Sequence, residues 1–533
     1  MLTNKNSKKD AKSAIVIGSG FGGLASAIRL QSLGFEVTIC EKRDLPGGRA
    51  YVFRQDGFTF DAGPTVITAL PCLEEVFSSV GKNLEDYCEL MPITPFYQLC
   101  WEDGTRFDYS GDFENTLKQI KELSGDKDVE GYKDFLKYTE QVFIEGYEKL
   151  SAEAFLDWWS MIRVSPQLIK LQAYQSVYQT VSQFIKNEKL CQAFSFHSLL
   201  VGGNPFQTSS IYTLIHFLEK KWGVHFPKGG TGSLVNAFVK LFEENGGKLI
   251  LNCELEQILT KNNKVIGVKV KDGQILNADL VVSNADVMHT YKKLLNQSPR
   301  GIEMTKNLEN KSFSMSLFLI YFGAKKKFEN IKHHMVLFGP RYRELLKDIF
   351  KNGHLADDFS LYLHAPTVSD PSLAPEGCEG FYVLSPVPHL GLADIDWNVE
   401  GPKYADKILN YLDKHYLPGL KENLITQKIY TPFDFEKDLN AHNGSAFSLE
   451  PILTQSAYFR CHNRDSSIEG LYFVGAGTHP GAGVPGVVQS AKATCKVIAN
   501  DYDRQQSIPR NKNFNSLKKV KIEESPMELN TNL

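Results

Sequence analysis

The sequence predicts an α/β fold in which a nucleotide-binding domain is interrupted by a second, substrate-binding domain of mixed helices and strands. Three observations support this prediction. An apolar run at 14–18 leads through a glycine-rich turn into a helix-like pattern, in IVIGSGFGGLASAIRL. Short strand-type runs return after residue 227, and a strand, a glycine loop and a helix follow at 470–500. The segments between these parts are longer and rich in aromatic residues.

Composition limits the classes of protein to consider. With 533 residues, 42% of them hydrophobic, the chain can form two or three domains with large cores. Its net charge of −3 is spread along the sequence, so we expect no nucleic-acid partner. Nine cysteines without a CxxC pair fit a reducing cytoplasm. The first residues lack the apolar core of a secretory signal, and no apolar run is long enough to span a bilayer.

The first glycine motif predicts a dinucleotide site. Gly18, Gly20 and Gly23 follow a strand and open a helix, as the G-x-G-x-x-G fingerprint requires. Gly18 permits the tight turn, Gly20 lets the backbone approach a pyrophosphate, and Gly23 allows close packing of helix and strand. Glu41 stands eighteen residues after Gly23, at the end of the next strand, where it can accept both ribose hydroxyls. An acid there favours a ribose without a 2′-phosphate.

Two further glycine segments indicate a flavin rather than a nicotinamide. Pro46-Gly47-Gly48-Arg49 resembles the GGR segment of amine-oxidase-like flavoproteins, where the arginine lies near the phosphate and ribityl region of the cofactor. The distant segment LYFVGAGTHPGAGVPGVVQSAKA, 471–493, reads as a strand, a glycine loop and a helix. The N-terminus of that helix would stabilise negative charge on a reduced flavin.

Longer segments make the resemblance specific. The sequence is similar to the bacterial-type phytoene desaturases of the carotenoid desaturase family from about residue 14 to 502. The similarity is carried by DAGPTVIT, FSFHSLLVGGNPFQTSSIYTLIHFLE, FPKGGTGSLV, SNADVMHTY and VGAGTHPGAGVPGVV. It implies non-covalent FAD, an amine-oxidase-like flavoprotein fold, and stepwise dehydrogenation of phytoene, a forty-carbon polyene, to lycopene.

The resemblance also implies which residues hold the cofactor. The glycine fingerprint and Glu41 would contact the ADP half, the backbone of Leu255 would face adenine, and the region 475–487 would face the flavin. The expected set is Gly18, Ser19, Gly20, Gly22, Gly23, Glu41, Lys42, Gly48, Arg49, Leu255, Gly475, Gly486 and Val487. At Gly475-Ala476-Gly477 the sequence lacks the acid that many amine-oxidase-like proteins carry, so we assign no acid to that role.

The chain is divided accordingly. We expect disordered tails at 1–13 and 503–533, and an FAD-binding domain built from 14–93, 227–303 and 460–502. The substrate domain comprises a helical, membrane-facing region at 94–226 and a second part at 304–459. Within 94–226, FLDWW, FSFHSLL and YTLIHFL are expected to be helical. Asp272-Gly273 indicates a hairpin.

The chemistry of the expected substrate limits the catalytic residues. A hydrocarbon offers no polar handle, so the site needs a hydride acceptor and a long apolar tunnel. The allylic cation can lose its proton to a weak base or to the reduced flavin, so no strong catalytic dyad is required. Arg163 is the candidate catalytic residue, with a solvated surface arginine as the alternative. The family commonly has an acid where Ser160 stands here.

No metal is expected, because no histidine lies in an HxxxH or HExxH pattern and the pair His333-His334 has only Glu329 nearby. A lipid-dissolved substrate predicts peripheral attachment to the cell membrane through helices around 161–185. Oxygen or a quinone would reoxidise the flavin. Two other activities stay open: another carotenoid-processing flavoenzyme (a desaturase of a different polyene, an isomerase or a saturase) and an amine-oxidase-like flavin oxidase.

Overall fold

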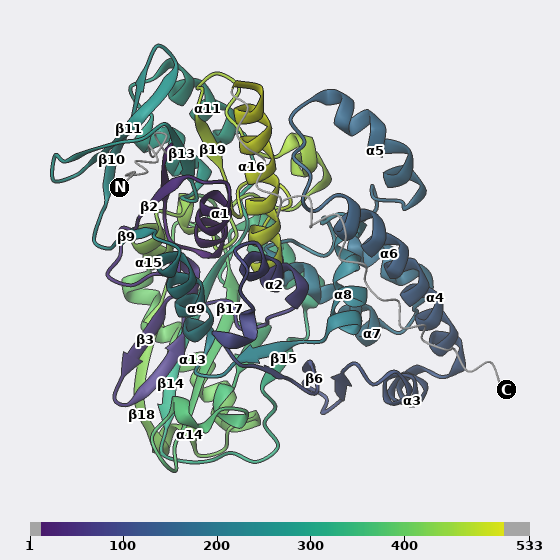
Figure 1. Ribbon diagram of the computed structural model, residues 1–533. Helices are drawn as coiled ribbons and strands as arrows, with labels where there is room; N and C mark the ends of the chain where they lie inside the picture. Colours follow the sequence, from purple (N-terminus) through teal and green to yellow (C-terminus); the bar gives the residue numbers. More distant parts are fainter. Residues whose placement is uncertain (1–11, 506–533) are drawn as a thin grey trace, which may run out of the picture.

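The computed structural model describes residues 12–505, and its frame is a five-stranded parallel sheet (Figure 1). In spatial order the strands are β19 (Leu471–Phe473), β13 (Leu280–Ser283), β1 (Ser13–Ile17), β2 (Glu36–Cys40) and β9 (Lys248–Ile250). All four pairings are parallel. The central strands are largely apolar and buried, as expected when both faces of a parallel sheet are covered. Three distant stretches of chain therefore build one sheet.

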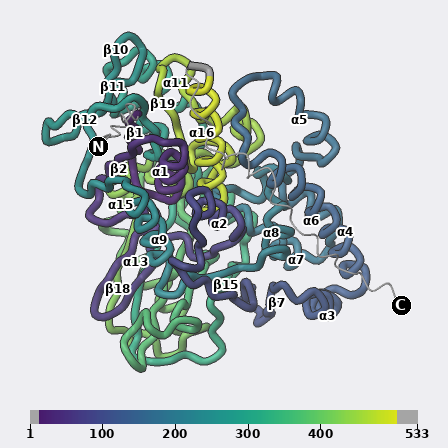
Figure 2. Tube along the Cα trace, in the orientation of Figure 1, coloured from purple at the N-terminus to yellow at the C-terminus, as the bar shows by residue number. Residues whose placement is uncertain are grey.

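The two faces of this sheet have different covers. Helices α1 (Phe21–Ser32), α2 (Leu70–Ser78), α9 (Thr231–Glu244) and α16 (Val484–Gln505) cover one face. An antiparallel sheet of β10 (Leu255–Lys261), β11 (Lys264–Val270) and β12 (Ile275–Asn277), with α10 (Val287–His289) and α11 (Pro299–Glu309), covers the other. Ala14 and Val16 of β1 belong to the first cluster, and Ile15 and Ile17 to the second. Figure 2 shows α1 and α16 side by side, although they lie at opposite ends of the chain.

A seven-stranded mixed sheet forms the second domain. In spatial order its strands are β18 (Leu424–Tyr430), β14 (Ser316–Ala324), β17 (Glu379–Val387), β16 (Leu361–His364), β15 (His334–Phe338), β6 (Tyr97–Trp101) and β7 (Arg106–Tyr109). Helix α13 (Trp397–His415), with α14 (Leu420–Asn423) nearby, packs on one face. Leu317, Leu319 and Tyr321 of β14 point to the opposite face, toward the largest buried cluster.

A lobe of helices closes that opposite face and lies at the right in Figure 1. Its helices are α3 (Phe113–Ser124), α4 (Asp126–Phe143), α5 (Trp158–Lys170), α6 (Val177–Phe184), α7 (Glu188–Ser195) and α8 (Leu214–Trp222). Smaller elements join the lobe to the rest: β5 (Leu90–Pro92) pairs with β8 (His225–Pro227), and α12 (Tyr342–Lys347) follows β15.

The structure differs from the sequence-based expectation inside 94–226. Residues 97–109 form β6 and β7 rather than helix, and β6 pairs in parallel with β15. The physical reason is a period of two: Tyr97, Leu99 and Trp101 face one cluster, whereas Cys100 faces the other. In FLDWW only the two tryptophans are helical, because the Asp157 side chain caps α5 by accepting the Ser160 N–H at 2.8 Å.

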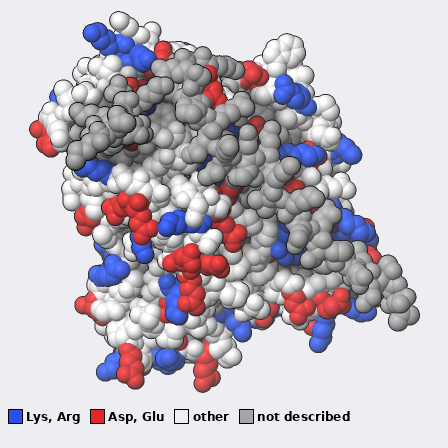
Figure 3. All heavy atoms as spheres, in the orientation of Figure 1, with Lys and Arg blue, Asp and Glu red and all other residues white. Residues whose placement is uncertain are grey.

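Other expectations on local structure are met. The Asp272-Gly273 turn joins the antiparallel strands β11 and β12, so the predicted hairpin is confirmed. The predicted tails fall mostly outside the described residues, although β1 begins at Ser13 and α16 runs to Gln505. On the face seen in Figure 3, acidic and basic side chains are interspersed, in keeping with the small net charge.

One buried carboxylate connects two motifs that the sequence analysis quoted separately. The hairpin of β3 (Val52–Gln55) and β4 (Phe58–Asp61) ends at Asp61, the first residue of DAGPTVIT. Its oxygens accept the N–H groups of Thr231 at 2.9 Å and Gly232 at 3.3 Å, where α9 begins in FPKGGTGSLV. The Asp61 side chain thus caps a helix that is distant in sequence, although burial raises its pKa to about 6.

We expect Asp61→Ala to lower the stability of the protein. The substitution leaves two buried N–H groups of α9 without an acceptor, which costs about 1–3 kcal/mol. Thermal unfolding followed by circular dichroism measures the effect. Asp61→Asn keeps one acceptor oxygen and should lose less. Equal midpoints for wild type and Asp61→Ala would show that the cap contributes nothing.

Candidate cofactor and substrate cavity

One cavity of about 560 Å³ runs from the glycine turn of the parallel sheet to the space between the seven-stranded sheet and the helical lobe. Its polar part is lined by the end of β2, the start of β10, the residues that follow β13, and the starts of α1 and α16. Its remaining wall is mainly apolar. The apolar residues include Leu199, Leu200, Ile211, Leu214, Ile215, Leu317, Leu319, Val336, Phe338 and Leu361. A polar end and an apolar end therefore share one space.

The glycine turn leaves no room for side chains. Gly18 has a φ of +88°, a left-handed conformation that favours glycine. A β-carbon on Gly23 would lie 2.1 Å from the carbonyl oxygen of Gly18, so the expected close packing of helix and strand is confirmed. Helix α1 begins at Phe21 with Gly20 as its N-cap and has no side-chain cap. Its first N–H groups are therefore open to an anion at the cavity wall, which Gly20, Phe21 and Gly22 line.

Glu41 is held at the cavity by the residue that follows Gly18. Its Oε2 accepts the Ser19 backbone N–H at 2.8 Å and the Ser19 hydroxyl at 2.6 Å, and its Oε1 accepts the Arg43 N–H at 2.9 Å. Ser19 is fully buried and does not line the cavity. We therefore assign Ser19 the role of positioning Glu41, in place of the direct cofactor contact expected from the resemblance. Glu41 lines the cavity and keeps further lone pairs for hydroxyl groups.

Lys42, Gly48 and Arg49 also line the cavity. The Lys42 ammonium donates to the carbonyl of Lys437, in α15 (Pro432–Leu439), at 2.6 Å and to Asn440 Oδ1 at 3.0 Å. The Arg49 guanidinium donates to the Ala446 carbonyl at 2.6 Å. Both cations are anchored to the second domain, so this turn joins the two domains at the cavity.

The remaining predicted cofactor residues fall into two groups. Leu255, Gly486 and Val487 line the cavity, the last two in the first turn of α16. Gly475 and Gly23 do not line it. Gly475 instead packs behind the wall: its N–H donates to the Ser490 hydroxyl at 3.2 Å, and its φ is +105°. These two glycines shape the turns that carry the lining residues.

Two residues after β13 were missed as site residues. The Asn284 side chain lies between the glycine segments, and a β-carbon on Gly22 or Gly475 would come within 2.7 Å of its Oδ1. Asp286 caps α10 through Oδ1, and its buried Oδ2 has no partner among the described residues. Burial raises the Asp286 pKa, opposed by the charge of Arg49. Both residues lie in SNADVMHTY, one of the segments that resemble the carotenoid desaturases. The sequence of that segment does not indicate what the two side chains do.

Arg163, the candidate catalytic residue, is not brought to the cavity. It is exposed on α5 and is absent from the cavity wall. The neighbours Met161 and Leu168, on another side of the same helix, do line the cavity. This position agrees with the alternative reading of Arg163 as a solvated arginine.

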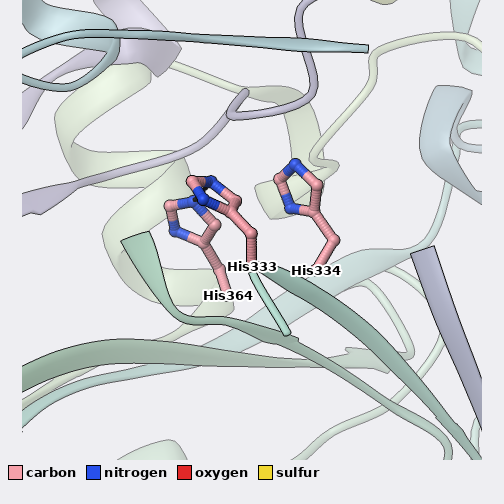
Figure 4. Close-up of side chains that lie close together, drawn as sticks. All are labelled: His333, His334 and His364. Carbon is pink, nitrogen blue, oxygen red and sulfur yellow. Dashed lines mark hydrogen bonds between the residues drawn. The ribbon is translucent and has the colours of Figure 1, made fainter. Parts of the chain in front are cut away.

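Three buried histidines lie together at the adjacent strands β15 and β16, as Figure 4 shows. His334 pairs with His364 across β15 and β16, and His333 precedes β15. Because His364 is distant in sequence, its position beside the other two could not be predicted from spacing. Their ligand-type nitrogens lie within 4.8 Å of one another. The two Nε2 atoms of His333 and His364 are 3.1 Å apart, a hydrogen-bond distance between neutral rings.

Charge is the obstacle to a metal at these histidines. Burial lowers the pKa of all three, and no carboxylate of residues 12–505 belongs to their cluster. A divalent cation would bring two positive charges into an apolar interior without an anion. The absence of a metal stays a prediction.

The residues present fit FAD. The uncapped start of α1 suits a pyrophosphate, Glu41 suits ribose hydroxyls, and the unpartnered Oδ2 of Asp286 suits a hydroxyl of the ribityl chain. Glycines at the positions where a β-carbon would clash leave the backbone of the turn accessible to the cofactor. The polar end of the cavity thus offers donors where the cofactor carries charge and acceptors where it carries hydroxyls.

We expect Glu41→Gln to weaken FAD binding about 10–100-fold, because hydrogen bonds to a charged group contribute about 1.5–3 kcal/mol. Titration of the apoprotein with FAD, followed by flavin fluorescence, gives the dissociation constant. Glu36→Gln is the matched control, since Glu36 is exposed at the other end of β2. Unchanged affinity in Glu41→Gln would remove Glu41 from the binding site.

Comparisons with known proteins agree with this geometry. A family model for flavin containing amine oxidoreductases matches residues 21–499. The phytoene desaturase (lycopene-forming) of Pseudescherichia vulneris is 58% identical, over 92% of this chain and 99% of the relative. The phytoene desaturase (neurosporene-forming) of Rhodobacter capsulatus is 41% identical, over 91% and 93%. A solved oxidoreductase from Methanosarcina mazei has a TM-score of 0.60 at 18% identity, over 91% of this chain and 100% of that one.

These findings confirm the predicted fold, the FAD cofactor and the resemblance to the bacterial-type phytoene desaturases. The family match extends from the start of α1 to residue 499 and so includes the helical lobe and most of the cavity wall. The chain belongs to the flavin containing amine oxidoreductase family.

Proposed function

We propose that this protein is an FAD-dependent phytoene desaturase that dehydrogenates phytoene stepwise to lycopene in carotenoid biosynthesis. The observation that carries the proposal is the identity of 58% to a lycopene-forming phytoene desaturase over nearly the whole length of both chains. The cavity supports it independently, because its apolar part opens directly beside the flavin site.

The proposed mechanism divides the work between the cofactor and the chain. When bound, FAD supplies the hydride acceptor for the C–H bond that breaks. The start of α1 and the side chain of Glu41 would hold the ADP half of the cofactor. The apolar walls from β14, β15 and the helical lobe exclude water and orient by shape a substrate that has no polar group.

A second candidate differs only in the product. The relative from Rhodobacter capsulatus is named as neurosporene-forming and is 41% identical over nearly all of this chain. Both activities share the cofactor frame, and the number of dehydrogenation steps depends on how far the polyene advances along the cavity. An isomerase, a saturase or an amine oxidase would use the same frame and is distinguished by the same experiment.

We expect expression in a phytoene-accumulating host to convert phytoene to lycopene, with product identified by chromatography and absorption spectrum. Gly23→Val is the negative control, because its β-carbon meets the Gly18 carbonyl and disrupts the turn. Neurosporene as the end product would support the second candidate. Unchanged phytoene beside soluble, FAD-loaded protein would overturn the proposal.

The entrance for a lipid-dissolved substrate is proposed to lie at α5. We define the α5 patch as the exposed side chains Trp158, Trp159, Ile162, Ile169 and Tyr174. Trp159 is 70% exposed and Ile169 65%. Four of these side chains lie on α5 and Tyr174 follows shortly after the helix ends. Exposed apolar side chains gathered in this way are typical of a membrane-contacting surface.

The α5 patch is connected with the cavity. Met161 and Leu168 of α5 line the cavity, as do Leu453 and Ala457 from the segment that α5 packs against. The Trp158 ring lies 6.1 Å from the ring of Tyr458 in that segment. None of the helices in residues 12–505 combines the length and the apolar composition that crossing a membrane requires. Peripheral contact through the patch would let phytoene pass from the bilayer to the flavin, and oxygen or a quinone would then accept the electrons.

We expect Trp159→Asp combined with Ile169→Asp to reduce binding to phosphatidylcholine liposomes at least 100-fold. Each exposed side chain that enters the bilayer contributes about 1.5–3 kcal/mol. Liposome flotation measures the bound fraction. The control pair, Ile275→Asp with Ile302→Asp, changes exposed isoleucines elsewhere on the surface. Equal flotation of both double variants would remove the α5 patch as the attachment site.

A further inference from the structure

The apolar part of the cavity contains one carboxylate, and the proposed reaction releases one proton for each double bond formed. We propose that Glu219 is the catalytic base that receives this proton. The inference rests on the proposed desaturase function and names the residue that completes its chemistry.

The reaction needs both a hydride acceptor and a proton acceptor. At one carbon the C–H bond breaks with its electron pair, which goes to the hydride acceptor. At the neighbouring carbon the C–H bond breaks as the proton leaves to an Oε atom of Glu219, and its electron pair becomes the new π bond. The substrate is oxidised by two electrons, the established cofactor is reduced, and Glu219 ends protonated.

Position separates Glu219 from the other acids of the cavity. Five carboxylates line it: Glu41, Glu219, Glu254, Asp286 and Asp438. Glu41 is held by Ser19, Asp286 caps α10 beside Arg49, and Asp438 is 3.7 Å from the Arg43 guanidinium. Glu254 is 2.8 Å from Lys271. These four lie around the nucleotide part, whereas Glu219 projects from α8 among the apolar residues Phe196, Ile215 and Leu218.

Two hydrogen bonds fix the Glu219 carboxylate. Its Oε1 accepts the Tyr97 hydroxyl at 2.6 Å, and its Oε2 lies 3.1 Å from His197 Nε2. Burial lowers the His197 pKa to about 3, so the ring is neutral. Toward an ionised Glu219, which can only accept, it donates as the Nε2–H tautomer. Glu219 is 1% exposed and has no Lys or Arg partner within residues 12–505. The carboxylate is oriented but its charge is not neutralised, as a proton acceptor requires.

Polar side chains lie between this carboxylate and another part of the cavity wall. Tyr97 lies close to Tyr362, whose hydroxyl is 3.2 Å from Thr65 Oγ1, and Tyr362 and Thr65 both line the cavity. Thr65 belongs to DAGPTVIT, the segment that continues from the flavin-domain hairpin. Polar groups therefore continue from Glu219 to the wall of the FAD-binding domain.

The titratable groups that face Glu219 are all neutral near pH 7. Tyr97 from β6 and Tyr109 from β7 have pKa values raised by burial, and those of His197 and His216 are lowered by burial. Tyr362 and His334 lie beyond Tyr97 and are also neutral. Burial raises the Glu219 pKa to about 7, opposed by the Tyr97 hydrogen bond. A base with this pKa is matched to neutral pH.

His479 and His289 also line the cavity, and His479 is the histidine next to the start of α16. Its Nε2 lies 2.8 Å from the Leu150 carbonyl, and burial lowers its pKa to about 4. A group that holds a proton so weakly is a poor acceptor at neutral pH. Burial shifts the two pKa values in opposite directions, which favours Glu219 as the acceptor.

Glu219→Gln tests the proposal in the FAD-loaded enzyme with phytoene in phosphatidylcholine liposomes. We expect kcat to fall 10²–10⁴-fold, with KM and FAD content changed by less than threefold. In wild type, log kcat should rise with pH up to about 7 and then level, because the base must be ionised. In Glu219→Gln this rise should disappear. Glu219→Asp, which keeps a carboxylate in a shorter side chain, should retain the rise at a lower kcat.

Glu450→Gln is the matched control. Glu450 is also buried, and burial also raises its pKa to about 7, but it does not line the cavity. Its replacement should leave kcat and the pH profile unchanged. Infrared titration adds a readout independent of turnover: the carboxylic acid band that titrates near pH 7 should lose a component in Glu219→Gln that Glu450→Gln retains.

The outcomes separate this inference from the proposed function. Wild type without activity on phytoene overturns the function itself. Active wild type together with a Glu219→Gln enzyme of normal kcat and unchanged pH profile overturns Glu219 as the base and leaves the function intact. If Glu219→Gln fails to hold FAD, Glu219→Asp decides: normal kcat in that variant counts against the proposal, and a reduced kcat with the pH rise retained supports it.

Discussion

Three stretches of chain meet where α1 begins, and they pack so closely that two of them must have glycine at the contact. Gly22 belongs to the first stretch, Asn284 follows β13 in the second, and Gly475 follows β19 in the third, with the amide of Asn284 filling the space between the glycines. The parallel pairing of β1, β13 and β19 brings these ends to one edge of the sheet. Because the contact depends on missing side chains, it fixes both the turn at the cofactor and the position of α16.

The cavity follows from how the second domain is attached to this junction. Asp61 connects the β3–β4 hairpin with the start of α9, and Lys42 and Arg49 donate to carbonyls of the second domain. The Asp61 contact is buried within the FAD-binding domain, whereas the contacts of Lys42 and Arg49 cross to the second domain. The two cations therefore help to keep the second domain at its spacing from the flavin turn. The apolar space between them is a consequence of that spacing, closed on the remaining side by the helical lobe.

Sequence reasoning found the parts of the site in which one residue type is required at one position. Gly18, Gly23 and Glu41 could be predicted because a tight turn, a close helix and a ribose each demand a particular residue after a strand. It could not find Asn284 or Asp286, since their roles depend on which strands are neighbours. The strand character of 97–109 was hidden for the same reason: an aromatic-rich run becomes a strand because β15 offers it a partner. The position of His364 beside His333 and His334 likewise depends on the register of β15 and β16.

Location in the fold, rather than the degree of burial, distinguishes an acid that can act from one that cannot. Glu219 and Glu450 are both nearly inaccessible to solvent, and burial raises the pKa of each to about 7. Glu219 differs because a tyrosine from β6 and a histidine after α7 hold both of its oxygens, and because α8 presents it to the cavity. That arrangement requires residues 97–101 to be a strand of the second sheet. The unexpected strand at 97–101 therefore both completes that sheet and holds the carboxylate in place at the apolar part of the cavity.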